Sequence, residues 1–168
     1  MIYNGHSNSS SSLQHCNQRK DPPTRKTGVS EAVVKIIADD MKTRGKGGAI
    51  VNVSSVLAYT VSPSYGVYCA TKGAVDQLTR SMAVEFGPYN IRVNSVNPTV
   101  VRTRMAEMEG LLDKDSEIAQ DLIKRTPLKR FADPEDVVNP ILFLLSDKSA
   151  MITRITLPVD GGITVSFN

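Results

Sequence analysis

The sequence predicts an α/β fold in which a parallel sheet carries helices on both faces. Short apolar runs bounded by turn residues alternate with longer segments whose apolar residues recur every three or four positions. Strands that alternate with helices in this way pair in parallel through right-handed crossovers. With 168 residues, of which 40% are apolar, the chain is long enough for about one domain.

The first predicted helix follows Ser30, which can cap it, and its apolar face is expected at Val33, Ile37 and Met41. Glycines then lead into a short apolar run, which is typical of a buried parallel strand. The remaining elements follow in chain order: strand 49–53, helix 65–86, strand 91–96, one or two helices within 103–125, a helix starting at 133 and strand 155–159.

Two of these helices have clear signals at their ends. The helix at 65–86 has a predicted apolar stripe and stops at a Gly-Pro pair; the stripe consists of Ala74, Leu78, Met82 and Phe86. The last helix begins with Asp133 as its cap, a proline in its first turn and acidic residues near its positive end. Pro140 lies inside that helix, where a proline costs about 3 kcal/mol.

Charge and composition divide the chain into two parts. Residues 1–28 are basic and serine-rich with only five apolar members, so we expect a disordered leader there. Residues 29–168 carry 16 basic and 16 acidic residues, and we expect them to form the folded part. A neutral body argues against nucleic-acid binding, which calls for a basic face.

Residue usage excludes further classes of site. The only two histidines, His6 and His15, lie in the leader, so the body has no Ser-His-Asp site and no metal site of the usual zinc type. Two cysteines give no disulfide framework, and a reducing, cytoplasmic location is expected. No apolar stretch reaches the 18 residues that membrane insertion requires.

The first candidate for chemistry is the pair Tyr68 and Lys72. Four residues apart on a helix, a phenol and an ammonium share one face, and the cation favours the phenolate. Such a pair can act as a general acid at neutral pH without histidine. Taken alone, the spacing favours an ordinary solvated pair on a helix surface.

The positions of two other segments strengthen the functional interpretation. Ser55 and the segment 97–103 each follow the carboxyl end of a predicted strand, where open α/β sheets bind ligands. A phosphate-binding glycine loop would follow a strand and open a helix. Gly45, Gly47 and Gly48 instead follow a helix and open a strand, so they predict no phosphate cradle.

Four segments resemble the carboxy-terminal part of a classical short-chain dehydrogenase/reductase. They are GAIVNVSS (48–55), VYCATKGA (67–74), IRVNSVNP (91–98) and VDGG (159–162). Within the family the chain most resembles the L-xylulose (dicarbonyl) reductases, through NPTVV (97–101), ILFLLSDKS (141–149) and LPV (157–159). The resemblance implies a partial Rossmann-type, doubly wound parallel sheet.

The resemblance also implies an activity and its residues. The chain would be an NADPH-dependent carbonyl reductase that converts L-xylulose to xylitol and reduces α-dicarbonyls. Tyr68 would donate the proton, Lys72 would activate Tyr68 and hold the nicotinamide ribose, and Ser55 would orient the carbonyl. Pro98, Val101 and Thr103 would flank the nicotinamide. Family members commonly form homo-tetramers, so a homo-oligomer is expected.

The chain also departs from the family pattern. The glycine-rich dinucleotide loop, the strand that selects NADP over NAD and a further catalytic asparagine are expected upstream, where the sequence around 22–23 has no resemblance to the family. Arg154 stands where the family usually turns on glycine. These departures predict impaired turnover, and they leave a second hypothesis: a non-catalytic fragment that associates with itself or with a full-length relative.

Overall fold

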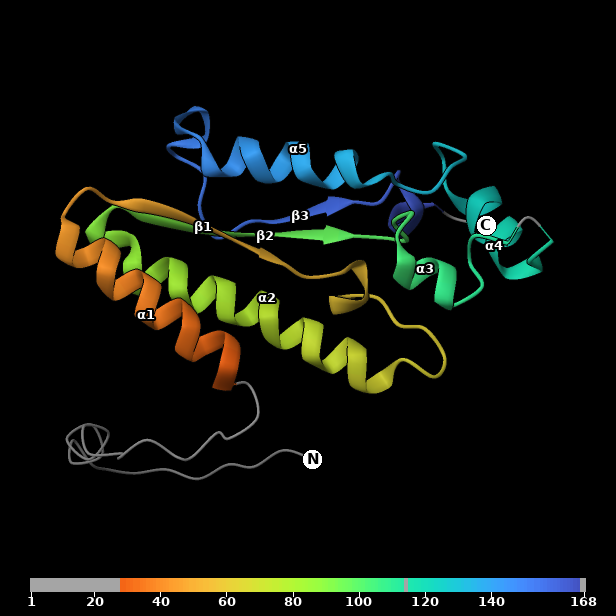
Figure 1. Ribbon diagram of the computed structural model, residues 1–168, viewed down its shortest axis with the longest axis horizontal. Coiled ribbons are helices and arrows are strands. Elements are labelled where there is room, and N and C mark those ends of the chain that lie inside the picture. The colour runs from red at the N-terminus through yellow and green to blue at the C-terminus, as the bar shows by residue number, and fades with distance from the viewer. Residues whose placement is uncertain (1–27, 114, 167–168) are drawn as a thin grey trace, which may run out of the picture.

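The computed structural model describes residues 28–113 and 115–166 and contains a three-stranded parallel sheet (Figure 1). The strands are β1 (Gly48–Val53), β2 (Ile91–Pro98) and β3 (Thr156–Val159), paired in the order β1-β2-β3. The helices are α1 (Gly28–Arg44), α2 (Gly66–Phe86), α3 (Arg104–Met108), α4 (Glu117–Arg125) and α5 (Pro134–Leu145).

Helices cover both faces of this sheet. Figure 1 shows α1 and α2 on one face and α5 on the other. The strands separated by helices therefore form the doubly wound parallel arrangement that the alternation of elements predicted. The expected leader, residues 1–28, lies outside the described residues except for Gly28, which begins α1.

The core lies between the central strand β2 and the two long helices. Met82 and Phe86 from α2 pack with Val93 from β2, and all three are at most 2% exposed. Val34 and Ala38 complete this cluster from α1. The expectation that Ile37 faces the core is wrong, because its side chain is 43% exposed. Met41, which was also expected on this face, does pack against the cluster, so Val34 and Ala38 are buried in place of Ile37 alone.

Two predicted boundaries also shift. The helix starts at Gly28, so Ser30 lies inside α1 and does not cap it. The strand predicted at 91–96 continues through Asn97 and Pro98. The extension is possible because Pro98 pairs with Val159 at the end of the strand, where Thr99 supplies the next backbone N–H to the Val159 carbonyl oxygen at 3.2 Å.

The glycines near 45–48 form a tight turn from helix to strand, as predicted. Gly47 has a φ of +70°, and a Cβ there would lie 2.6 Å from the Asn90 carbonyl oxygen. Gly48 N–H in turn donates to that oxygen at 3.1 Å. The glycines thus allow the chain to enter β1 beside the start of β2.

Arg154 adopts the backbone conformation that glycine would favour. Its φ is +68°, in the left-handed region, and its N–H donates to the Val93 carbonyl oxygen at 2.8 Å. This hydrogen bond connects the turn before β3 to β2. The side chain therefore occupies a position that is strained for any residue with a Cβ.

α5 runs without interruption through Pro140. Pro140 has no N–H, so the Asp136 carbonyl oxygen lacks its usual helical donor. We expect Pro140→Ala to raise the free energy of unfolding by up to about 3 kcal/mol. Urea denaturation would measure the change, with the exposed Val138→Ala on the same helix as the control. A lower stability for Pro140→Ala would show that the ring's packing outweighs the missing hydrogen bond.

Candidate active site

Ser55 lies directly after β1 and begins the short helical turn Val56–Ala58. Its Oγ accepts a hydrogen bond from the Leu57 N–H at 3.2 Å, and the residue is 7% exposed. The hydroxyl serves as a cap, so its orientation is fixed. Among the described residues no acceptor takes the hydroxyl's own proton, which leaves it able to donate.

Tyr68 and Lys72 lie one turn apart near the start of α2, as the spacing predicted. The Lys72 Nζ is 5.6 Å from the centroid of the Tyr68 ring and donates to the Val53 carbonyl oxygen at 3.1 Å. Tyr68 is 37% exposed, so its phenol can reach a small molecule. The ammonium therefore lies between the proposed acid and the end of β1.

A second contact holds the helix against the segment that carries Ser55. The Ser54 Oγ donates to the Lys72 carbonyl oxygen at 3.2 Å. The helix also runs close to the turn after Ser55, since a Cβ on Gly73 would lie at van der Waals distance, 3.4 Å, from the Ala58 carbonyl oxygen. The structure thus brings Ser55, Tyr68 and Lys72 to one region at the carboxyl end of β1.

The environment of Lys72 has two opposing effects. Burial lowers the pKa of the ammonium below its ordinary value, because desolvation disfavours the charged form. The carboxylate of Asp76 opposes this effect and raises the pKa. The net shift is downward, so Lys72 gives up its proton more readily than an exposed lysine.

A buried polar network lies behind these residues, and the sequence analysis missed it. Asp76 on α2 is 3% exposed and accepts hydrogen bonds from Ser95 and Asn97 of β2. Asn97 also donates to the Ser55 carbonyl oxygen at 2.9 Å. The sequence signal for this network was an acidic residue on the helix face that packs against the sheet. A buried carboxylate requires hydrogen-bond partners, so polar residues opposite it on the sheet could have been expected.

Of the three residues expected to flank a nicotinamide, Pro98 ends β2, and Val101 and Thr103 lie in the loop that follows. Pro98 is buried at the end of the strand, and Val101 forms a parallel bridge with Ala132. The Thr103 Oγ1 donates to the Val101 carbonyl oxygen at 3.3 Å. The loop is therefore held in place beside the carboxyl ends of β1 and β2.

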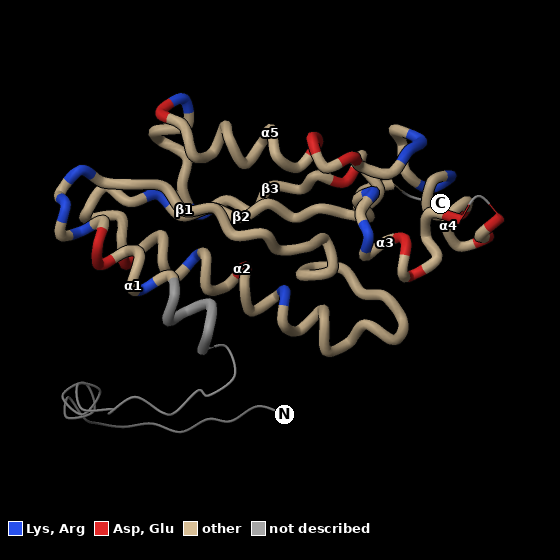
Figure 2. Tube along the Cα trace, in the orientation of Figure 1, with Lys and Arg blue, Asp and Glu red and all other residues tan. Residues whose placement is uncertain are grey.

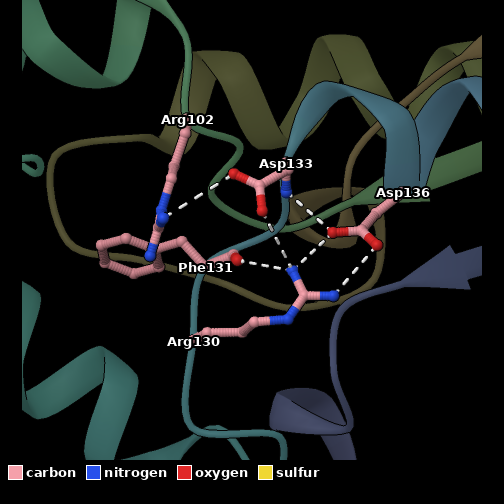
Figure 3. Close-up of polar contacts among 5 residues, drawn as sticks. All are labelled: Arg102, Arg130, Phe131, Asp133 and Asp136. Carbon is pink, nitrogen blue, oxygen red and sulfur yellow. Dashed lines mark hydrogen bonds and ion pairs between the residues drawn. The ribbon is translucent and has the colours of Figure 1, made fainter.

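Charged residues at the start of α5 support this loop (Figure 3). Arg130 donates to both carboxylate oxygens of Asp136, and the Asp133 N–H donates to Asp136 Oδ2 at 2.8 Å. Arg102, which follows Val101, lies 3.8 Å from Asp133. The cluster links the loop after β2 to the first turn of α5.

A cavity of about 250 Å³ opens beside this cluster. It lies at the carboxyl ends of β2 and β3, and its lining consists of Thr99, Leu128, Arg130, Ala132, Asp136, Pro158, Val159, Asp160 and Gly161. Ser55, Tyr68 and Lys72 are absent from the lining. The cavity therefore borders the loop and does not contain the predicted catalytic residues.

The short helix α3 is connected to the start of α2. The Tyr65 hydroxyl donates to Glu109 Oε2 at 3.2 Å, and its ring stands edge-on to Tyr68 at 6.2 Å between centroids. The negative charge of Glu109 raises the pKa of the Tyr65 phenol. Tyr65 is thus a second phenol beside Tyr68, one that the sequence analysis did not single out.

Comparison with known proteins shows the family of this chain. The family described as enoyl-(acyl carrier protein) reductase matches residues 28–164. The chain belongs to the short-chain dehydrogenase/reductase family, whose members are NAD(P)-dependent oxidoreductases. It is 52% identical over 130 residues to an L-xylulose reductase of Homo sapiens, covering 77% of this chain and 52% of that protein.

Other relatives have related names. A carbonyl reductase [NADPH] 2 of Sus scrofa is 49% identical over 134 residues, which cover 80% of this chain and 54% of that protein. A gluconate 5-dehydrogenase of Burkholderia cenocepacia, solved with NADP and tartrate, is 34% identical with a TM-score of 0.75, covering 80% of this chain and 51% of that chain. The chain spans about half the length of the curated relatives it matches.

The described residues contain neither a membrane-spanning helix nor a metal-binding group of acidic, His and Cys side chains. Within 28–113 and 115–166, no helix is both long and apolar enough to cross a membrane. No group of three or more His, Cys, Asp or Glu side chains in the described part of the chain could hold a metal ion. The organised polar groups described above are thus the main candidates for chemistry.

The cluster at α5 gives a prediction about acid stability. Hydrogen bonds from Arg130 and from the Asp133 N–H lower the pKa of Asp136 from 3.8 to about 2. A carboxyl whose pKa is lower in the folded state stabilises the fold above its unfolded pKa and loses that effect as the pH falls. The contribution of Asp136 is therefore complete above about pH 4 and disappears toward pH 2.

Asp136→Asn should consequently lower the urea midpoint slightly at neutral pH, with a difference from the wild type that shrinks toward pH 2. The effect is small because the pair is exposed to solvent. Asp147→Asn, an exposed carboxylate after α5, is the matched control. A difference that stays constant across the acid range would show that Asp136 acts through packing and not through its charge.

Proposed function

We propose that the chain is an NADPH-dependent carbonyl reductase of the L-xylulose reductase type, which reduces L-xylulose to xylitol and also reduces α-dicarbonyls. The observation that carries the proposal is the position of Lys72, whose ammonium bonds to the end of β1 and lies beside the ring of Tyr68. Relatives named L-xylulose reductase and carbonyl reductase [NADPH] 2 support the substrate class and the choice of NADPH. The lack of a disulfide framework supports a cytoplasmic location.

The residues at the carboxyl ends of the strands fit the nicotinamide end of such a cofactor. The phenol of Tyr68 and the ammonium of Lys72 suit the hydroxyls of a ribose. Pro98 ends β2, and the loop that follows it holds Val101 and Thr103 through a bridge to Ala132 and a hydrogen bond. NADPH supplies the hydride when it is bound. Within residues 28–113 and 115–166 no glycine-rich loop leads from a strand into a helix, so we expect weak NADPH binding and slow turnover by these 168 residues alone.

The chain's own residues would then act as follows. The Ser55 hydroxyl oxygen already accepts a hydrogen bond from the Leu57 N–H. The hydroxyl donates a hydrogen bond of its own to the substrate carbonyl and so orients the substrate. Tyr68 gives its phenolic proton to the carbonyl oxygen as negative charge develops there. Lys72 stabilises the phenolate that remains, because its positive charge lies close to the ring.

Measuring NADPH oxidation by the purified chain with L-xylulose or diacetyl tests the proposal. We expect slow turnover that falls about 10²-fold or more in Tyr68→Phe, because the general acid is removed. Tyr89→Phe is the matched control, since Tyr89 is an exposed phenol at the far end of α2. A human L-xylulose reductase assayed alongside sets the scale.

The possible outcomes separate the parts of the proposal. Turnover that survives Tyr68→Phe would contradict the assigned acid. A rate equal to that of the L-xylulose reductase would contradict the expected impairment. No NADPH binding and no turnover would contradict the reductase and favour the second candidate function below.

The second candidate is a non-catalytic chain that self-associates or binds a full-length relative. β1 is an edge strand of the described sheet, and an unpaired edge recruits other strands. The middle of α5 also carries no charge (Figure 2), and its Leu142 and Phe143 side chains are 59% and 42% exposed. Such an apolar surface is typical of an interface.

This candidate predicts a concentration-dependent assembly. Sedimentation velocity at micromolar concentrations should show dimers or larger species, consistent with the homo-tetramers expected from the resemblance. Leu142→Lys on the exposed face of α5 should shift the distribution toward monomer, whereas Lys148→Glu beyond the helix should not. A monomer at every concentration would contradict self-association.

A further inference from the structure

We propose that Asp76 is a positioning residue of the active site: its carboxylate acts on the Lys72 ammonium from the same face of α2 and, through Asn97, fixes the backbone that carries Ser55. The inference rests on the proposed function, because Lys72 and Ser55 have the roles given there. Asp76 lies on α2, eight residues after Tyr68, and does not reach the substrate region itself.

The geometry of the network supports the positioning role. The Ser95 hydroxyl lies 3.1 Å from Asp76 Oδ1 and 3.2 Å from Asn97 Oδ1, so its single proton sits between two acceptors. Asn97 Nδ2 donates to Asp76 Oδ2 at 2.8 Å and to the Ser55 carbonyl oxygen at 2.9 Å. The carboxylate thus fixes the amide that holds the backbone at Ser55.

Burial makes these hydrogen bonds specific. Ser95 and Asn97 are fully buried and Asp76 is 3% exposed, so solvent cannot replace a lost partner. Each buried polar group in the network has a partner within the network or on the backbone. The carboxylate accepts from both Ser95 Oγ and Asn97 Nδ2, whereas an amide in its place would keep one acceptor oxygen and carry no charge.

Asp76 also stands in the right place to act on Lys72. The two residues are four positions apart on α2, so their side chains share one face of the helix. The hydrogen bond of the Lys72 ammonium goes to a neutral carbonyl, that of Val53. Burial lowers the pKa of Lys72, and the negative charge of Asp76 opposes that effect.

A charged Lys72 matters because only the ammonium can stabilise a tyrosinate. Two further titratable groups face this region. They are Tyr68 on α2 and Tyr59, which directly follows the short helical turn Val56–Ala58. Burial raises the pKa of the Tyr59 phenol, and the negative charges of Asp160, directly after β3, and of Asp76 raise it further. Asp76 is the anion that acts on Lys72 from the same helix.

The pH profile of Lys72 acetylation tests this role directly and requires no turnover. Trace acetylation with acetic anhydride, quantified by peptide mass spectrometry, gives the midpoint at which each lysine becomes reactive. In Asp76→Asn the midpoint of Lys72 should fall, so that its labelling below the midpoint rises severalfold relative to the wild type. The internal reference is Lys42, a residue of α1 whose ammonium lies over the ring of Phe86 at the other end of α2.

Two variants separate the charge from the packing. Ser95→Ala removes a hydrogen bond to Asp76 but keeps the charge, so it should leave the Lys72 midpoint unchanged. Asp76→Glu keeps the charge as well and should restore a midpoint near that of the wild type. Equal midpoints in the wild type and Asp76→Asn would overturn the proposal.

Loss of folding is also an informative outcome. Asp76→Ser, which removes the charge and retains a hydroxyl, serves as a second uncharged variant if Asp76→Asn does not unfold cooperatively. If neither variant folds, Asp76 belongs to the fold alone and the proposal is wrong. A chain that oxidises no NADPH counts against the proposed function, whereas the titration of Lys72 can still be measured.

Discussion

The parallel pairing of β1 with β2 is the constraint on which the site depends. Val53 lies beside Val96 in the register, so the segments that follow the two strands leave the sheet at the same edge. Ser55 follows one strand, and the loop with Val101 and Thr103 follows the other. A slip of one residue would turn the buried side chains of β2 to the opposite face and move Asn97 away from α2.

The helix α2 converts this edge into a chemical site. Its first turns present Tyr68 and Lys72 to the end of β1, and its middle presents Asp76 to the buried polar side chains of β2. The same helix buries Met82 and Phe86 further along, which anchors it against the sheet. The positions of the reactive groups therefore depend on packing that lies more than one helical turn away.

Much of the fold could be predicted from the sequence, because strand runs and helix ends have local signals. Asp133 before Pro134 marked the start of α5, and Gly87 marked the end of α2. The burial of Val34 and Ala38 in place of Ile37 could not be predicted, since all three are apolar and the position of α2 decides between them. The network around Asp76 was also out of reach, because its partners come from β2, about twenty residues later, and depend on register.

Protection of Lys72 by the cofactor tests the central claim, that Tyr68 and Lys72 receive the nicotinamide end of NADPH. The acetylation rates of Lys72 and Lys42 would be followed in the purified chain as NADPH is added. We predict that labelling of Lys72 slows severalfold, while labelling of Lys42, which belongs to α1 and lies over the ring of Phe86 at the far end of α2, is unchanged. Unchanged labelling of Lys72 at every NADPH concentration, or equal slowing at both lysines, would contradict it.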